Sequence, residues 1–292
     1  MNNMTENIAA KREWSKKMLA GIRNLPPVPF IMVEISKLLD NPRTGAADLG
    51  KIISKDQAMV AKILSVANSP LYGLPRRVST IEFAIVILGF DQIKNIVIAF
   101  SMMEAFRTKE DRRWNRRAYW VHSLMVASAA KRIADDLGIR KSGEAFTAGL
   151  LHDLGISVIQ KYFNDDFQKI NNLVEEQQMR FMNAEEKILG ISHQEIGKYL
   201  VEKWNLPAGL GEAILYHHQP SLAEEEKKLC AVVHIADYMT QRFQIGSFNW
   251  DESIPLDLGV IDILQLGDEN YLESFIESYH ELFKVNLESL NL

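Results

Sequence analysis

Histidine and aspartate residues that could bind metal ions are concentrated after residue 120. Imidazole nitrogens and carboxylate oxygens together suit transition metals of intermediate softness. His152 and Asp153 are adjacent in the apolar stretch AGLLHDLG, so we expect both to be buried, and burying a carboxylate without a partner is costly. A cation beside it would remove that cost. The residues that we expect to surround a pocket for two metal ions are His122, His152, Asp153, His193, His217, His218 and Asp237.

Each of these signals also has a plain structural explanation. A His-Asp dipeptide can occur by chance, and neighbouring histidines at a helix end, such as His217 and His218, are often only surface residues. On a helix the two would project about 100° apart, so one cavity must lie between their directions. His234 could orient a ligand or be a hydrogen-bonded core histidine, and His280 is expected at the surface. The argument for a site therefore rests on the conjunction of the signals.

Helical periodicity indicates which elements position these residues. Apolar or small residues recur on one helical face over 115–137, and His122 lies on that face. Ser192 and Glu195 resemble a capping box, which would place His193 in the first turn of a helix.

The remaining helix boundaries follow from prolines and from one ambiguous stretch. Pro207 suits the start of a helix, and Pro220 would end that helix just after the histidine pair. The apolar stretch 81–90 could be a strand by composition, but its pattern continues as a helix through Phe100. We therefore predict an all-α chain with short loops.

The chain divides into four predicted segments. A polar N-terminal segment covers 1–19, an N-terminal helical lobe 20–110, a metal-binding helical lobe 111–245, and a C-terminal helical tail of one or two helices 246–292. In the tail an aromatic stripe with i, i+4 spacing is expected to pack on the core. The stripe consists of Tyr271, Phe275, Tyr279 and Phe283.

The segment RTKEDRRWNRR at 107–117 separates the two lobes and carries most of the local positive charge. It is expected to be a solvated linker or helix start. Alternatively its basic side chains could contact phosphates, with Trp114 stacked on a base. The net charge of −5 makes nucleic-acid binding the least favoured function.

Composition limits the class of protein. A chain of 292 residues with 47% hydrophobic side chains can form one large core or two smaller ones. The single cysteine, Cys230, excludes an internal disulfide and a cysteine-based metal motif. The polar start does not resemble a signal peptide, and no uncharged apolar run is long enough for a membrane helix. We expect a cytoplasmic protein without membrane segments.

The order of the candidate ligands resembles that of the HD superfamily of phosphohydrolases and its HD-GYP branch. The first lobe narrows the match to the HDOD family, a bacterial signalling domain. Three of its stretches resemble the pattern of that family: LPPVPF at 25–30, IISKDQAMVAKILSVANSPLYG at 52–73 and IEFAIVILGFDQIKNIVI at 81–98. The resemblance covers roughly 20–240. It implies an HD-superfamily helical bundle preceded by an N-terminal helical lobe.

The resemblance also implies how the metals would be shared. One ion would be bound by His122, His152, Asp153 and Asp237, and the second by His193, His217, His218 and the same Asp153. The cofactors would be two divalent or mixed-valence transition metal ions, Fe or Mn in the first place and Zn or Ni as alternatives. Such a pair can activate a water and clamp a phosphoryl oxygen.

Two departures from the HD-GYP pattern put hydrolysis in doubt. HDLGI stands where the enzymes read HDxGK, so Ile156 replaces a lysine that would compensate phosphate charge. After the histidine pair the glycine-rich segment ending in Gly-Tyr-Pro is absent, and Glu224, Glu225 and Glu226 would repel a phosphate if they faced the site.

The sequence thus leaves three hypotheses. The favoured one is a signalling or regulatory protein with a di-metal site that binds a protein partner or a small nucleotide or phosphate ligand. The second is a metal-dependent phosphohydrolase acting on a nucleotide or phosphodiester, and the third is nucleic-acid binding through 107–117.

Other family motifs are expected to be structural: Asn68 and Ser69 at a helix end, and Gly89 permitting close approach in a turn between packed helices.

Overall fold

The computed structural model describes residues 2–21, 31, 34–35, 38, 44–72, 74, 76–108, 112–245 and 255–289, and these residues are all-α without a strand, as predicted. The first half contains α1 (Asn2–Gly21), α3 (Ala46–Ile53), α4 (Gln57–Ala67), the 3-10 turn η1 (Pro70–Tyr72), α5 (Ile81–Leu88), α6 (Phe90–Ala105), α7 (Arg116–Asp136) and α8 (Ser142–Leu151). It is followed by α9 (Leu154–Tyr162), α10 (Asn164–Gln177), α11 (Phe181–Leu189), α12 (His193–Lys203), α13 (Ala208–Leu215), η2 (Pro220–Leu222), α14 (Lys227–Arg242), α15 (Val260–Leu264), α16 (Glu269–Glu277) and α17 (His280–Ser289). Several positions used in the sequence analysis lie outside the described residues. They are the motif 25–30, Gly73, the stretch 109–111 of the basic segment and Trp250 near the start of the tail.

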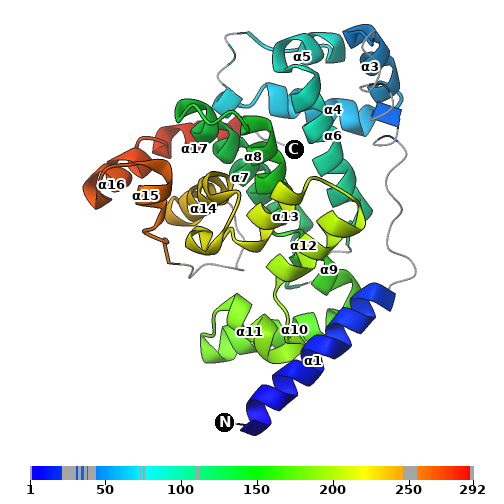
Figure 1. Ribbon diagram of the computed structural model, residues 1–292. Coiled ribbons are helices and arrows are strands. Elements are labelled where there is room, and N and C mark those ends of the chain that lie inside the picture. The colour runs from blue at the N-terminus through cyan, green and yellow to red at the C-terminus, as the bar shows by residue number, and fades with distance from the viewer. Residues whose placement is uncertain are drawn as a thin grey trace.

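Helices α3 to α6 form the N-terminal lobe, at the upper right of Figure 1. Asn68 ends α4 and fixes the following loop, since its amide donates to the carbonyls of Leu64 and Val78 and accepts from the Val78 N–H. This is the structural role predicted for that motif. The lobe is joined to the rest of the molecule by the packing of α6 on α8.

The stretch 81–90 is helical, and a sharp turn follows it. Gly89 has φ +84°, a region that L side chains rarely adopt, and α5 and α6 meet there at an angle of 116°. The expectation that Gly89 permits close packing is wrong, because nothing lies within 4 Å of where a Cβ would be. Among the described residues no single helix is long and apolar enough to span a bilayer, although this bent pair would be if taken together.

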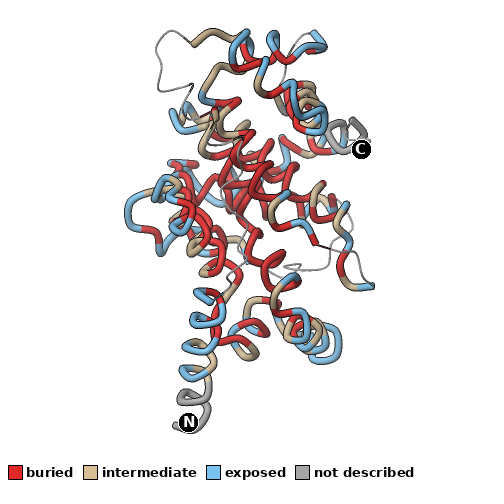
Figure 2. The backbone as a smooth tube through the Cα atoms, turned by 90° about the vertical axis from the view of Figure 1, so that its right-hand side faces the viewer, coloured by how far each residue is buried: buried red, intermediate tan, exposed pale blue. Residues whose placement is uncertain are grey.

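The long helix α7 runs through the centre of the second lobe and is covered by α8 and α14 (Figure 1). The Asn115 side chain caps its start by accepting the Ala118 N–H, which confirms the helix predicted over 115–137. Buried residues are densest in this central region (Figure 2). The candidate ligand His122 lies in the buried middle of α7.

Helix α1 packs against α11 at the lower end of Figure 1. Lys11 donates to the Lys187 carbonyl and Ser15 to the Leu189 carbonyl, while Arg12 pairs with Glu195 of α12. The predicted polar segment 1–19 is therefore a helix attached to the second lobe. The segment boundaries themselves stay a prediction.

The C-terminal tail differs from its prediction of one or two helices on one aromatic face. Its described residues form three helices, and the stripe is divided between α16, which contains Tyr271 and Phe275, and α17, which contains Phe283. Tyr279 and Phe283 are buried, whereas Tyr271 is 57% exposed. His280 is half-buried and stacks on Phe243, with ring centroids 4.7 Å apart, so it is not a simple surface residue.

Candidate metal centre

The seven predicted ligands come together in the interior of the second lobe, and each is at most 3% exposed. His122 lies in the middle of α7 and Asp237 in α14. His152 and Asp153 occupy the break between α8 and α9, where the chain leaves one helix and begins the next. His193 opens α12.

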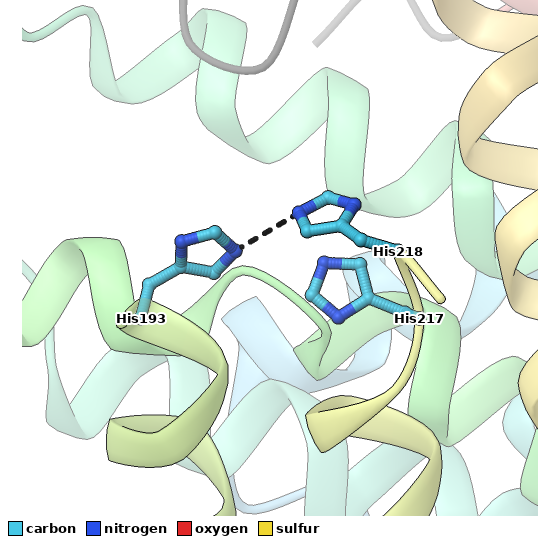
Figure 3. Close-up of side chains that lie close together, drawn as sticks. All are labelled: His193, His217 and His218. Carbon is cyan, nitrogen blue, oxygen red and sulfur yellow. Dashed lines mark hydrogen bonds between the residues drawn. The ribbon is translucent and has the colours of Figure 1, made fainter. Parts of the chain in front are cut away.

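His217 and His218 lie in the turn after α13, not on a helix as predicted, because α13 already ends at Leu215. In that turn both rings lie close to the ring of His193, with one possible ligand atom of each within 4.8 Å of the others (Figure 3). Ser192 and Glu195 form the predicted capping box and hold His193 in the first turn of α12.

The first half of the cluster consists of His122, His152, Asp153 and Asp237. The Nε2 atoms of His122 and His152 are 3.2 Å apart, and Asp153 Oδ2 lies 3.3 Å from the second of them. Asp237 Oδ1 lies 3.3 Å from His122 Nε2. Four donor atoms therefore face one small volume.

The second half consists of His193, His217, His218 and again Asp153. The Nε2 atoms of His193 and His218 are 3.2 Å apart (Figure 3). Asp153 Oδ1 lies 3.5 Å from His193 Nε2 and 3.7 Å from His217 Nε2. Asp153 thus presents one carboxylate oxygen to each half.

Hydrogen bonds behind the rings fix which nitrogen faces the cluster. His152 Nδ1 donates to the Gly149 carbonyl at 2.7 Å and His217 Nδ1 to the Ile214 carbonyl at 2.6 Å, since a carbonyl can only accept. In the neutral form, a ring that carries its proton on Nδ1 has a lone pair on Nε2. The backbone therefore prepares both histidines as ligands through Nε2.

The donor set fits metal ions. Two imidazole nitrogens bound to one ion at about 2.1 Å lie roughly 3.0–3.4 Å apart, whether the coordination is octahedral or tetrahedral. Both 3.2 Å Nε2 separations fall in that range. The buried His217 Nε2 also has no hydrogen-bond partner among the described residues. A cation in each half would bind the facing Nε2 atoms as ligands.

The electrostatics of the cluster favour positive charge within it. Burial raises the pKa of Asp153, but the charges and hydrogen bond of the surrounding histidines lower it well below its usual range. Burial lowers the pKa of His152, and the adjacent Asp153 raises it more, to about 9. Burial and the neighbouring imidazoles hold the pKa of His217 well below its usual value. The carboxylates of the cluster thus favour a positive charge at His152.

Sequence reasoning missed two residues that support the ligands. Glu185 Oε2 accepts both the backbone N–H of His193, at 3.0 Å, and its Nδ1–H, at 2.8 Å. Thr240 Oγ1 lies 3.3 Å from His122 Nδ1 and donates to the Asp237 carbonyl. A signal existed for Glu185, because it lies on the apolar face of FMNAEEKIL, where an acidic residue needs a reason to be buried.

His234 combines the two roles that the sequence left open. Its ring is buried and its Nδ1 donates to the His217 carbonyl at 2.7 Å, while its Nε2 accepts the Asp257 N–H at 2.9 Å. It is thus a hydrogen-bonded core histidine that also holds the backbone of a candidate ligand.

Comparison with known proteins fits this geometry. The family model of the HDOD domain matches residues 25–220 of the sequence. The chain belongs to the HDOD family. An HDOD domain protein of unknown function from Geobacter sulfurreducens has a similar crystal structure, with 28% identity and a TM-score of 0.77 over 98% of this chain and 100% of that one.

Two more distant relatives extend the comparison. A protein from Shewanella amazonensis SB2B that is proposed to be a phosphohydrolase shares the HDOD fold, with 22% identity and a TM-score of 0.70 over 94% of this chain and 97% of that one. An uncharacterized protein from Treponema pallidum (strain Nichols) is 26% identical over 270 residues. That alignment covers 90% of this chain and 50% of the relative, so the HDOD chain spans about half the length of that curated protein.

The two departures from the hydrolase pattern have structural consequences in this HDOD protein. Ile156 is fully buried in the core, so the position offers no charge to a substrate. The backbone N–H groups of Glu224, Glu225 and Glu226 all donate to the Glu212 carboxylate. These contacts make the acidic run a helix-linking loop.

The nucleic-acid hypothesis loses its stacking residue. Trp114 is 1% exposed and packs on Tyr119 and Phe167, so it cannot stack on a base without unfolding. Arg113 is held by Glu175 at 2.8 Å and by Gln168.

Proposed function

We propose that this HDOD protein is a metal-dependent regulatory protein of a signalling pathway. Two transition metal ions, Fe or Mn in the first place and Zn or Ni as alternatives, would be held by His122, His152, Asp153, His193, His217, His218 and Asp237. The observation that carries this proposal is the burial of every one of these side chains to at most 3% exposure. Buried carboxylates of this kind need a cation beside them, and the uncharged, buried Ile156 at the position of the hydrolases' lysine favours regulation over hydrolysis.

The ligands also explain how metal binding would regulate the fold. They come from α7, the α8–α9 break, α12, the turn after α13, and α14. When bound, the ions supply the positive charge that two buried carboxylates require. Asp153, Asp237 and the histidines would then hold five separate segments at fixed distances and set the surface that a protein partner contacts. A reducing cytoplasm, compatible with the single buried Cys230, belongs to this proposal.

A metal-dependent phosphohydrolase is the second candidate. It is supported by the complete donor set and by Asp153, which presents one oxygen to each half. It is opposed by the buried, uncharged Ile156, which stands where the hydrolases read lysine. Its substrate would be a nucleotide or another phosphodiester.

Elemental analysis and a turnover assay test both candidates. We expect about two equivalents of transition metal after expression in metal-rich medium, and at most trace hydrolysis of a generic phosphodiester with Mn or Fe added. Less than about 0.2 equivalents of metal would exclude both candidates, because both require the site. Robust hydrolysis that disappears in Asp153→Ala would replace the regulatory proposal with the enzymatic one.

A further inference from the structure

A cavity of about 740 Å³ lies between the N-terminal lobe and the start of α7. Its described walls come from α4, α6, α7 and the beginning of α9, and they contain none of the seven candidate metal ligands. Cavities of roughly 300–1,000 Å³ are typical of sites for small organic ligands. The cavity is thus a second candidate site, separate from the metal centre.

The charges around this cavity leave two cations available to a ligand. Glu104 is already paired with Lys62 at 3.3 Å and with Arg107 at 3.0 Å. Arg116 and Arg117 also line the cavity, and no side chain among the described residues forms an ion pair or hydrogen bond with either. Two arginines that line one cavity without carboxylate partners favour an anion, and phosphate matches the planar donor geometry of a guanidinium group.

A buried hydroxyl points to a ligand independently of the charges. Ser101 lines the cavity and is only 5% exposed, and its Oγ has no hydrogen-bond partner among the described residues. A buried hydroxyl without a partner costs stability unless something else satisfies it. Such a polar group deep in the cavity can be satisfied by a polar atom of a bound molecule.

The remaining walls are mainly apolar and aromatic, and their polar members are Asp56, Thr108 and Ser157. Asp56 Oδ1 already accepts the Met59 N–H as the N-cap of α4. Met59, Phe106 and Trp120 contribute side chains, and Trp120 is only half-buried. The Trp120 ring stacks on Phe100, with centroids 4.9 Å apart, and Lys62 Nζ lies 4.9 Å from the Trp120 centroid. A flat ring could pack here, while an inorganic phosphate alone would fill only a small part of the volume.

We propose that this cavity binds a nucleoside phosphate, with the phosphate at Arg116 and Arg117 and the base among the apolar walls near Ser101. This inference goes beyond the proposed function and does not require metal. It nevertheless provides a connection to the metal centre through two residues of the cavity wall. Tyr119 lies one turn before His122 on α7, and Ser157 lies one turn after Asp153 on α9. A bound ligand would therefore contact the same helices that position two of the candidate metal ligands.

Isothermal titration calorimetry of the full chain tests the proposal. The probes are inorganic phosphate, the four nucleosides, and the corresponding nucleoside mono- and diphosphates, each with metal-loaded and with chelator-treated protein. We expect at least one nucleoside phosphate to bind more than about tenfold more tightly than its nucleoside and than phosphate. Binding should persist after metal removal, which separates this inference from the proposed function.

Substitutions locate the site. Arg116→Gln combined with Arg117→Gln should weaken binding by at least about tenfold, whereas the control Arg112→Gln, an exposed arginine outside the cavity, should change it by less than about twofold. Ser101→Ala should weaken binding without lowering the melting temperature, because the hydroxyl has no partner to lose in the protein. The proposal is overturned if no nucleoside phosphate binds below about 1 mM, if phosphate alone binds as tightly, or if the arginine pair can be replaced without loss.

Discussion

Replacing the shared carboxylate should remove both metal ions at once. Asp153 Oδ2 faces His152 at 3.3 Å and Oδ1 faces His193 at 3.5 Å, so each half of the cluster loses its common oxygen donor in Asp153→Asn. The asparagine has nearly the same shape, but its amide lacks the negative charge that attracts cations into a buried site. We expect metal content to fall from about two equivalents to below about 0.4.

The effect on stability can be worked out from linkage. A ligand at 100 times its dissociation constant stabilises the folded state by about 2.7 kcal/mol. Each kcal/mol shifts the melting temperature of a chain of this size by roughly 2–4 °C, so saturating a single site of that affinity would add about 5–10 °C. Two such sites would add up to about twice that amount. The variant should show no metal-dependent increase.

Differential scanning fluorimetry with and without excess metal provides the assay. Comparing the metal-induced shift within each protein removes the effect of the substitution on the metal-free fold. Asp165→Asn makes the same chemical change at an exposed position and should keep the full shift. If Asp153→Asn retains two equivalents of metal and the same shift, Asp153 is not the shared ligand and the di-metal interpretation is wrong.

Three further predictions concern the surroundings of the cluster. Glu185→Gln should weaken metal binding at the half of the cluster that contains His193 by roughly 10–100-fold, because the Glu185 carboxylate orients His193. The same change at the exposed Glu186, Glu186→Gln, should have no effect. Titration of each variant with metal measures the affinity. Gly155→Ala should destabilise the fold by about 3 kcal/mol or more in denaturant unfolding, because a Cβ would lie 2.0 Å from the His193 carbonyl oxygen. Cys230 should react with iodoacetamide at pH 8 only after unfolding, because burial and nearby Glu212 raise its pKa to about 12 and the thiolate is the reactive form.

For each of these three predictions, one experimental result would contradict the reasoning. Equal metal affinity in the two glutamate variants would show that Glu185 does not orient a ligand. Gly21→Ala, where no atom lies within 4 Å of a Cβ, is the matched control for Gly155→Ala, and equal unfolding energies would remove the packing argument. Rapid labelling of folded protein would show that Cys230 is accessible.

Local sequence signals were sufficient for several helices and for choosing the candidate ligands. The 3.6-residue periodicity of α7, the capping box at Ser192 and the apolar surroundings of His152 and Asp153 all describe interactions within a few residues. Such interactions are encoded where they act, so α7, the start of α12 and the burial of the His-Asp pair were predicted correctly. The helix predicted to carry His217 and His218 was wrong, because the end of α13 depends on where its neighbours allow the chain to turn.

Only the tertiary structure decided how these residues are used. The support of His193 by Glu185 and of His217 by His234 joins separate elements, and no local pattern reports such a contact. The same holds for the cavity, whose walls come from helices of both lobes. The sequence by itself determined which side chains can bind metal, because donor chemistry belongs to residue type. Their distances, burial and protonation were decided by packing, because those properties depend on neighbours that are distant along the chain.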